Sequence, residues 1–496
     1  MGKLEFVEFY KNALKLEDDD FNNFISTLDL GLPSTFRVTP TYFTDVLKNK
    51  FEEFSFVAKV PYLENVYTFD LKNRTDEYKK FIAFLVAETN IGLVQRQEIV
   101  SILPHMFMDV HADHYVLETC ASPGSKTKNL LETIKTGLLI SNDKTQSRVN
   151  ILITESMKKS IPSFIVTKMD ATSYKNMSIK FDRICCDVPC TGDGTVRKNP
   201  AVMPKWNVKN AIGLSSVQLK ILKRSLSILK EDGILVYSTC SWNPIEDEWV
   251  VDQALKEDGV ELVQNFDFIQ HSNADPRKIT VRKGITSFDY DGFSFDNPCL
   301  EACMRIMPQD QNTGGFFVAV LRKTKASAAT NSIGTGRMNP TFFEATDEVV
   351  AKIRKNYDIS KVKDHFVSFN GNFKNLFAVS PVCYEVLVNN PKLPVSYAGV
   401  KAFTESDLRP DSFRARSAYM EIADISADFS MSLKDFKLLL AEKDVENGKL
   451  SFAPKDIFTV QLMDTPLKFS GFSSRKKTFL YIDDNHRAAF SQIYLN

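Results

Sequence analysis

The sequence has few cysteines, no long apolar run and no excess of charge of either sign. Its eight cysteines include no CxxC pair, and no cysteine–histidine cluster has the spacing of zinc ligands. We therefore expect neither a disulfide framework nor a bound metal. No stretch approaches the roughly 18 consecutive apolar residues of a membrane-spanning helix. Because 62 basic residues balance 62 acidic ones, any surface for an anionic partner has to be a local patch.

The residues that are present are typical of a globular protein. Of the 496 residues, 43% are hydrophobic and 25% are charged, which excludes disorder as the dominant state. At roughly 100–200 residues per domain, this length predicts two to four domains. The first twenty residues are too acidic and too interrupted to act as a signal peptide.

The order of apolar and helical segments predicts a central α/β domain between two flanking regions. From about residue 106, short apolar runs alternate with helical stretches, which favours a doubly wound, mostly parallel sheet with helices on both faces. We predict an N-terminal region over 1–105, this α/β core over 106–325, a small polar linker over 326–340 and a separate, smaller domain over 341–496. The expected core strands are 115–117, 137–140, 164–167, 183–186, 234–238 and 313–321, and the expected helices are 126–136, 145–158 and 214–230, the last stopped by Gly233.

The segment from Val116 to Thr127 predicts a strand, a tight turn and the start of a helix. Small residues in such a turn let backbone N–H groups and the positive helix end approach a ligand closely. Taken alone, the segment is equally consistent with a plain connecting turn. The turn consists of Cys120, Ala121, Ser122, Pro123, Gly124, Ser125 and Lys126.

Acidic residues end the next two predicted strands. Asp143 follows Gly124 by 19 residues, where a carboxylate often grips a ribose diol, although it could also cap the next helix. Asp170 could accept a hydrogen bond from an adenine amino group or lie in a solvated turn. Together with the turn, the two positions favour an adenosine-containing cofactor, and the absence of GxGxxG makes a nicotinamide nucleotide less favoured.

Two cysteines follow the last two strands of the predicted parallel set. Cys190 comes three residues after Asp187, and Cys240 ends the following strand. Since ligands bind beyond the carboxyl ends of strands in such sheets, both thiols should reach one crevice. A lone cysteine is more often a buried, inert thiol, and we assign Cys185 and Cys186, which lie inside a strand, to packing.

A thiol in a cofactor crevice suits methylation of cytosine at carbon 5. This carbon is a poor nucleophile until a thiolate adds to carbon 6 and converts the ring into an enamine. An acid near ring nitrogen 3 then stabilises the developing charge, and Asp187 could do so only if it carries a proton in a dry site. A base must finally remove the hydrogen at carbon 5 before the thiol leaves.

The sequence resembles the Sun-domain family of RNA (cytosine-5)-methyltransferases, which use S-adenosylmethionine. Within that family it is most similar to the eukaryotic tRNA branch, and the similarity is strongest over 90–325. The segments that carry the resemblance are CASPGSKT (120–127), SNDK (141–144), DVPCTGDGTVRKN (187–199), STCSWNPIEDE (238–248), RIMPQDQNTGGFFVAVL (305–321) and VSPVCYEVLVNN (379–390).

The resemblance implies a role for each matching position. Cys240 would be the nucleophile, and Cys190 would assist release of the methylated RNA. The turn from Cys120 to Lys126 would line the S-adenosylmethionine site together with Asp143, Asp170 and Asp187, and Lys126 and Asp187 would also face the target base. The residues alone cannot assign the two thiols, because DNA cytosine methyltransferases use the cysteine of a Pro–Cys pair instead.

Three residues depart from the family pattern. Glu118 stands where the family has Asp, and Ser122 where it has Ala, so cofactor affinity could differ. Trp242 replaces a common Leu, and we expect it to change the rim of the pocket.

Basic residues gather in one part of this neutral chain. Between 195 and 230 there are eight basic residues and no acidic ones, which would hold RNA phosphates unless they form a merely solvated helix face. Arg197 and Lys198 adjoin the Cys190 segment and are the first candidates. The resemblance adds an α+β RNA-binding region near Arg37 and a β-rich, PUA-like C-terminal RNA binder, in which the basic cluster 475–477 is suggestive.

We therefore expect a tRNA (cytosine-5)-methyltransferase that is monomeric, holds no metal and does not enter a membrane. The expected location is the nucleus or nucleolus, with the cytoplasm as an alternative. Two other functions stay open at this point: a non-catalytic RNA-binding protein with a relict methyltransferase site, and a DNA cytosine methyltransferase.

Overall fold

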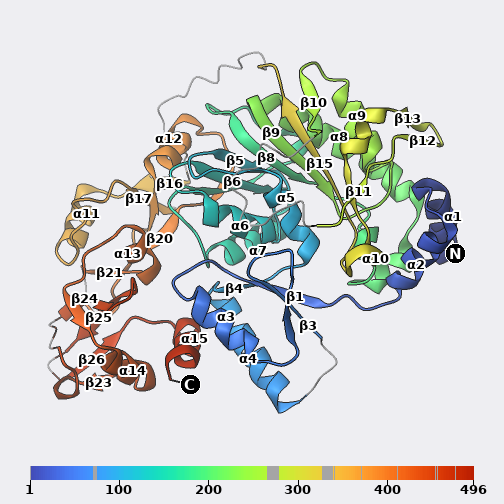
Figure 1. Ribbon diagram of the computed structural model, residues 1–496. Helices are drawn as coiled ribbons and strands as arrows, with labels where there is room; N and C mark the ends of the chain where they lie inside the picture. The colour runs from blue at the N-terminus through green and yellow to red at the C-terminus, as the bar shows by residue number, and fades with distance from the viewer. Residues whose placement is uncertain are drawn as a thin grey trace.

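A computed structural model describes the arrangement of the chain. It covers residues 2–70, 75–264, 279–326, 339, 341–369, 371–409, 411–452, 454, 456–474 and 476–495. Figure 1 shows a central twisted sheet covered by helices, with the first two helices at one side and the C-terminal region at the other. Nearly all of the predicted linker 326–340 lies outside the described residues. Among the helices described, none has the length and apolar character needed to cross a membrane.

The residues before the central domain form two units. Helices α1 (Gly2–Leu14) and α2 (Asp18–Leu28) bury Phe6, Tyr10 and Phe24 in the same hydrophobic cluster as Trp242 of the central domain. The second unit is an antiparallel sheet of order β2-β3-β1-β4, packed against two helices. Its elements are β1 (Ser34–Val38), α3 (Thr44–Glu52), β2 (Val57–Lys59), β3 (Val66–Phe69), α4 (Asp76–Asn90) and β4 (Val94–Arg96).

A ten-stranded sheet forms the centre of the molecule. Its strand order is β11-β14-β15-β9-β8-β5-β6-β7-β19, with β10 paired to β15. Strands β9, β8, β5, β6 and β7 are parallel, which confirms the predicted doubly wound core. The chain runs from β5 to β6 and β7 on one side and then returns to β8 and β9 on the other. The crevice between β5 and β8 is therefore where such sheets bind ligands.

The central elements lie close to their predicted positions. The strands are β5 (Tyr115–Glu118), β6 (Leu138–Asp143), β7 (Phe164–Lys168), β8 (Phe181–Asp187), β9 (Leu229–Thr239), β10 (Val260–Leu262), β11 (Arg282–Lys283), β14 (Met304–Ile306) and β15 (Phe316–Lys323). The helices are α5 (Leu103–Met106), α6 (Ser125–Thr133), α7 (Gln146–Ser156), α8 (Val208–Ile228), α9 (Glu248–Leu255) and α10 (Pro308–Gln311), and a separate hairpin pairs β12 (Ser287–Tyr290) with β13 (Phe293–Asp296).

The end of the long helix α8 differs from the prediction. The helix ends at Ile228 and β9 begins at the next residue, so Gly233 lies inside the strand and does not stop the helix. Leu229 is fully buried and pairs with Phe181 of β8. Because of this packing, the strand begins earlier in the chain, at residues that the local sequence pattern assigns to the end of the helix.

The C-terminal region contains two five-stranded sheets and also contributes one strand to the central sheet. Strand β19 (Val395–Ala398) pairs antiparallel with β7. The sheets are β16-β17-β18-β20-β21 and β22-β24-β25-β26-β23. Their strands are β16 (Phe342–Glu344), β17 (His365–Phe369), β18 (Asn375–Val379), β20 (Val400–Glu405), β21 (Phe413–Ala415), β22 (Phe429–Met431), β23 (Val445–Glu446), β24 (Asp456–Leu462), β25 (Lys468–Ser473) and β26 (Lys477–Leu480). The helices are α11 (Asp347–Arg354), α12 (Pro381–Asn389), α13 (Ser417–Ile422), α14 (Leu433–Ala441) and α15 (Asp484–Tyr494).

The first sheet unit and the last one share a core. Phe36 and Phe81 of the N-terminal sheet unit belong to the same buried hydrophobic cluster as Phe436 and Phe490 of the C-terminal region. Figure 1 shows α15 beside α3 and α4. The N-terminal sheet unit therefore packs on the last part of the C-terminal region, on the side of the central domain away from α1.

Candidate active site

The turn between β5 and α6 has the tight backbone that the sequence predicts. The Ala121 N–H donates to the Asn142 carbonyl of the neighbouring strand end at 2.7 Å. Gly124 has a φ of 101°, and a Cβ added there would meet Leu152 Cδ1 at 3.1 Å. The absence of side-chain bulk thus lets the backbone bend sharply against α7 before α6 begins at Ser125.

Glu118, one of the departures from the family pattern, stabilises this turn through hydrogen bonds to the neighbouring elements. Its buried carboxyl accepts hydrogen bonds from Thr127 Oγ1 at 2.5 Å and from Ser141 Oγ at 3.0 Å. Burial raises the pKa of Glu118 to about 7. The side chain therefore ties β5, β6 and the first turn of α6 together and does not itself project into the crevice.

Asp143 is buried at the end of β6 and faces the turn. Its carboxylate accepts from the Ser122 N–H at 3.2 Å and from the Lys144 N–H at 2.8 Å. Arg148 Nε lies 3.1 Å from both carboxylate oxygens. Since the Arg148 side chain is 52% exposed, it can turn outward, and the carboxylate then fits a ribose diol.

Asp170 follows the end of β7, next to the strand that ends at Asp143. Its side chain caps the turn after β7, which is one of the two roles that the sequence left open. It accepts from the Thr172 N–H at 3.0 Å and from Thr172 Oγ1 at 2.7 Å. Lys144 Nζ pairs with its other oxygen at 2.7 Å. Lys144 and then Thr172 lower the pKa of Asp170 to about 2. The ion pair joins the ends of β6 and β7 and keeps Asp170 charged at the mouth of the crevice.

Lys126 and Asp187 form an ion pair across the crevice between β5 and β8. Lys126 Nζ lies 2.6 Å from Asp187 Oδ2, and Ser238 Oγ donates to Asp187 Oδ1 at 2.8 Å. Burial opposes the charge of Lys126, but Asp187 outweighs it and raises the pKa of Lys126 above its ordinary value. The pair places one proton donor and one acceptor together at the strand ends.

The two predicted thiols share this crevice. Cys190 Sγ and Cys240 Sγ are 3.0 Å apart, and both cysteines are free and half-buried. The contact with Cys240, followed by burial and the carboxylates of Glu246 and Asp193, raises the pKa of Cys190 well above its ordinary value. The Cys190 thiol therefore holds its proton firmly while its sulfur lies in contact with the second sulfur.

A single buried carboxylate links the two cysteine loops. Glu246 accepts from the Thr191 N–H at 2.9 Å and from Thr191 Oγ1 at 2.5 Å. It also accepts from Ser241 Oγ at 3.1 Å and Gln218 Nε2 at 2.9 Å. Thr191 follows Cys190 and Ser241 follows Cys240, so Glu246 sets the separation of the two sulfurs. Glu246 was not singled out from the sequence, although a carboxylate seven residues after the end of β9 was a visible signal.

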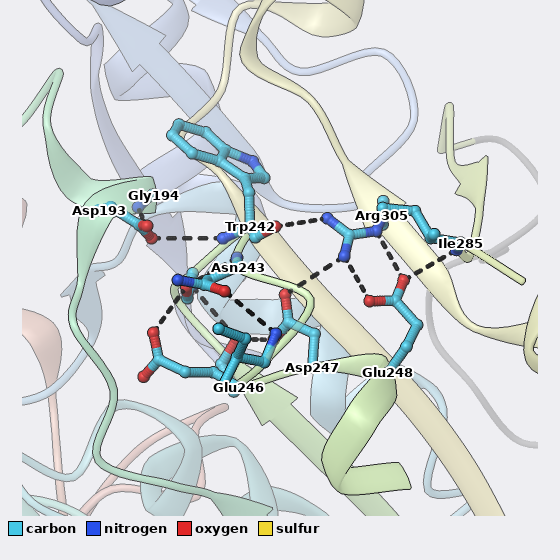
Figure 2. A network of polar contacts seen from close by, with 12 residues as sticks. Asp193, Gly194, Trp242, Asn243, Glu246, Asp247, Glu248, Ile285 and Arg305 are labelled. Carbon is cyan, nitrogen blue, oxygen red and sulfur yellow. Dashed lines mark hydrogen bonds and ion pairs between the residues drawn. The ribbon is translucent and has the colours of Figure 1, made fainter. Parts of the chain in front are cut away.

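Asp193 makes a second link between the same loops, as Figure 2 shows in part. Its Oδ1 accepts from the Trp242 N–H at 3.2 Å, and its Oδ2 accepts from Trp206 Nε1 at 3.1 Å and from the hydroxyl of Tyr10. Gly194 N–H donates to the Cys240 carbonyl at 2.9 Å. Helix α1 thus reaches the cysteine loops directly through Tyr10.

Trp242 does not line the pocket rim, which corrects the expectation from the sequence. Its side chain is fully buried, with its ring 4.9 Å from that of Phe24, and its Nε1 donates to the Ile306 carbonyl at 3.1 Å. Arg305 donates to the Trp242 carbonyl at 2.8 Å and pairs with the buried Glu248, as Figure 2 shows. The larger ring fills the space between α2 and the Cys240 loop, so its effect is on packing.

The three RNA-contact candidates occupy different environments. Arg37 is buried and binds both oxygens of Glu132, at 2.8 and 2.7 Å. Arg197 is also buried and donates to the Thr313 carbonyl at 2.7 Å. Only Lys198 of the three has an exposed side chain, at 64%. Arg37 and Arg197 hold elements together, whereas the Lys198 ammonium makes a long ion pair with Glu98, at 3.9 Å.

The remaining predicted features lie away from the crevice. Cys185 and Cys186 are fully buried in the sheet, which confirms their assignment to packing. In the described part of the chain, His111, Asp113 and His114 bring possible metal-ligand atoms within 4.8 Å of one another. They come directly before β5, at the amino ends of the parallel strands, whereas the thiols follow the carboxyl ends. They therefore cannot take part in chemistry at the thiols.

Comparisons with known proteins agree with this geometry. Residues 105–322 match the family model described as 16S rRNA methyltransferase RsmB/F. A multisite-specific tRNA:(cytosine-C(5))-methyltransferase of Saccharomyces cerevisiae is 33% identical over 67% of this chain and 57% of its own length. A tRNA (cytosine(34)-C(5))-methyltransferase of Drosophila melanogaster is 30% identical over 64% of this chain and 52% of its own length. The chain thus spans little more than half the length of these two relatives.

A solved structure supports the fold. A methyltransferase homologue protein from Pyrococcus horikoshii has a TM-score of 0.52 and 24% identity, and the match covers 64% of this chain and 94% of that one. The doubly wound sheet, the turn after β5 and the matched residues 105–322 lead to one assignment. The chain belongs to the RsmB/F, or Sun-domain, family of methyltransferases.

Proposed function

We propose that this chain transfers a methyl group from S-adenosylmethionine to carbon 5 of cytosine in RNA, with tRNA as the substrate. The observation that carries the proposal is the pair of thiols 3.0 Å apart beside the Lys126–Asp187 ion pair. The names of the similar proteins, which include two tRNA (cytosine-5)-methyltransferases, support the choice of substrate. The nucleus is the proposed location.

The residues at the mouth of the crevice fit the cofactor. When bound, S-adenosylmethionine would supply an electrophilic methyl group. The backbone of the 120–126 turn and the amino end of α6 would hold it, Asp143 would accept from its ribose, and Asp170 would lie beside its base.

The thiol pair performs the covalent step. With the proton held on Cys190, Cys240 Sγ adds to carbon 6 of a cytosine that has been turned out of its stack. Asp187 is hydrogen-bonded to the Lys126 ammonium, so a proton passed from Lys126 to Asp187 can go on to ring nitrogen 3. After the methyl group is in place, the proton of carbon 5 passes to a base, for which the Asp187 carboxylate is available once its own proton has gone to ring nitrogen 3. The electrons of that C–H bond form the 5,6 double bond, and Cys240 leaves as a thiolate to which the S–H of Cys190 can donate.

The two cysteines should respond differently to replacement. Cys240→Ala should abolish both methylation of bulk tRNA and covalent capture of RNA. Cys190→Ala should instead accumulate a protein–RNA adduct that survives denaturant. Cys299→Ala, at an exposed position, is the matched control and should behave as the parent protein.

The experiment also separates the other candidate functions. Adduct formation by Cys240→Ala and not by Cys190→Ala would reverse the assigned roles. Intact tRNA binding without any methyl transfer by the parent protein would favour a relict site. A labelled product that resists RNase would point to DNA as the substrate.

A further inference from the structure

A large cavity lies where the three parts of the molecule meet. It has a volume of about 1480 Å³ and is lined by the β1 and α4 ends, the carboxyl ends of α6 and α7, and the C-terminal strands. Neither thiol of the crevice lines it. Its walls carry nine lysine and arginine side chains against six aspartate and glutamate side chains. In a chain whose total charge is zero, this is a local positive region.

Three cations on the C-terminal wall have little compensation. Within the described part of the chain, neither Lys401 nor the Arg414 guanidinium makes a hydrogen bond or ion pair, and the buried Arg414 Nε has no acceptor. Arg414 lies over the Tyr481 ring at 5.0 Å, which fixes its direction. Arg416 pairs with Asp483 at the long distance of 3.7 Å. That carboxylate already accepts from His486.

The three charges also act on one another. Burial lowers the pKa of Lys401, and the positive charges of Arg416 and Arg414 lower it further. Like charges held together in a partly buried place repel, so the fold gains from an anion that neutralises them. A phosphate group, with several acceptor oxygens, matches two guanidinium forks and an ammonium.

The facing wall is positive as well. Glu132 pairs with both Arg37 and Lys159, at 2.7 and 2.9 Å. Lys135 and Lys158 also line this wall, and Lys158 pairs with Glu155 at 2.8 Å. The lining residues that precede the C-terminal region are four cations and three carboxylates, so this wall keeps a small excess of positive charge: Arg37, Lys135, Lys158 and Lys159 against Glu64, Asp113 and Glu132. A polyanion can enter between walls of this kind.

We propose that Lys401, Arg414 and Arg416 bind a backbone phosphate of the substrate RNA in this cavity. The proposal rests on the proposed function, since it names where that RNA continues beyond the crevice. Helix α6 connects the two places, because Ser125 begins it in the cofactor turn and Thr133 ends it at the cavity. Nine helical residues span about 13 Å, a distance that a short run of RNA backbone covers.

The test compares two double variants of the full chain. Lys401→Gln/Arg414→Gln removes two charges from the cavity wall, and Lys434→Gln/Lys437→Gln removes two exposed charges from α14 of the same region. We expect the cavity variant to bind tRNA roughly tenfold more weakly and to lose about one to two units of the slope of log affinity against log salt. The α14 variant should stay within about twofold of the parent protein.

Turnover distinguishes a binding role from a general loss of structure. The cavity variant should raise KM for tRNA and leave kcat at saturating tRNA unchanged. Thermal melting checks that the variant is folded. If the double variant unfolds, the single variant Lys401→Gln replaces it, and we expect a smaller loss of affinity in the same direction. Equal tRNA binding by the cavity and α14 variants would overturn the proposal.

Two further outcomes distinguish this proposal from binding of a free anion and from failure of the proposed function. If inorganic phosphate raised the melting temperature of the parent protein but not of the cavity variant, while tRNA affinity stayed equal, the cluster would hold a free anion and the proposal would fail. If the parent protein bound tRNA with the expected salt slope but transferred no methyl group, the proposed function would fail and the phosphate site would stand.

Discussion

Replacing Glu246 tests whether one carboxylate sets the geometry of both thiols. Glu246→Ala removes the acceptor shared by Thr191, Ser241 and Gln218. The two hydroxyls can turn to other acceptors, but the Thr191 N–H and the Gln218 amide cannot easily do so. At about 1–3 kcal/mol for each buried donor left without a partner, the free energy of unfolding should fall by about 2–6 kcal/mol. A displacement of the sulfurs by about 1 Å should lower kcat by roughly a hundredfold.

Glu246→Gln should restore most of this loss. The amide oxygen can accept from the Thr191 N–H and from Gln218, while its NH₂ can donate to the hydroxyls of Thr191 and Ser241 after they rotate. The amide also resembles the protonated acid, which matters because burial, followed by the charge of Asp193, raises the pKa of Glu246 to about 7.

The raised pKa of Glu246 gives the effect of pH a definite sign. The ionised carboxyl is disfavoured in the folded state, so the contribution of Glu246 to stability is complete below about pH 4.5 and is lost as the pH rises to about 7. The difference is about 3 kcal/mol. Chemical denaturation at several pH values should show this fall for the parent protein and not for Glu246→Gln.

Single-turnover methylation of tRNA, normalised to folded protein, is the decisive assay. Asp435→Ala serves as the control, because Asp435 is a buried carboxylate that accepts from the Ser451 N–H at 3.2 Å in the C-terminal region, remote from the thiols. It should lower stability without lowering kcat. A Glu246→Ala protein that was destabilised but kept full kcat, like this control, would refute the positioning role.

Two other substitutions have clear expected outcomes. Glu88 is fully buried without a hydrogen-bond partner in the described chain, and burial raises its pKa to about 8; the folded state is therefore penalised as the pH rises from about 4.5 to about 8, and Glu88→Gln should stabilise the fold by about 5 kcal/mol at pH 9. The gain should fall to about 2 kcal/mol at pH 6 and nearly vanish below about pH 4.5, and urea titrations that found an equal gain at pH 9 and pH 6 would contradict this. Trp242→Leu should lower the free energy of unfolding by about 2–4 kcal/mol because it leaves a cavity beside Phe24 and Tyr10; an unchanged denaturation midpoint would show that the ring is not a packing element.

The sequence was sufficient for the core because local patterns there agree with the tertiary structure. Alternation of apolar runs and helices predicted the parallel strands within a few residues, and the strand ends brought Cys190 and Cys240 together as expected. The end of α8 was wrong because burial of Leu229 against β8 decides that boundary, and a nearby glycine does not.

Features that depend on distant contacts could not be predicted in this way. The resemblance placed an RNA-binding region near Arg37, but this side chain is buried against Glu132, which lies 95 residues away in the chain. The hydrogen bond from Tyr10 to Asp193 was equally out of reach of a local pattern, because 183 residues separate the two in the chain. Glu246 stands inside a motif that was recognised, yet its role becomes visible only when Thr191 and Ser241 are seen on either side of it.

The pairing of β19 with β7 has a consequence for shortened forms of the protein. A fragment that stopped before the C-terminal region would leave the backbone N–H and C=O groups of β7 open to solvent. Such an uncovered strand border tends to recruit strands from other molecules. A catalytic fragment cut at residue 325 should therefore precipitate, unless the cut piece is supplied in trans or β7 is given charged residues that discourage self-association.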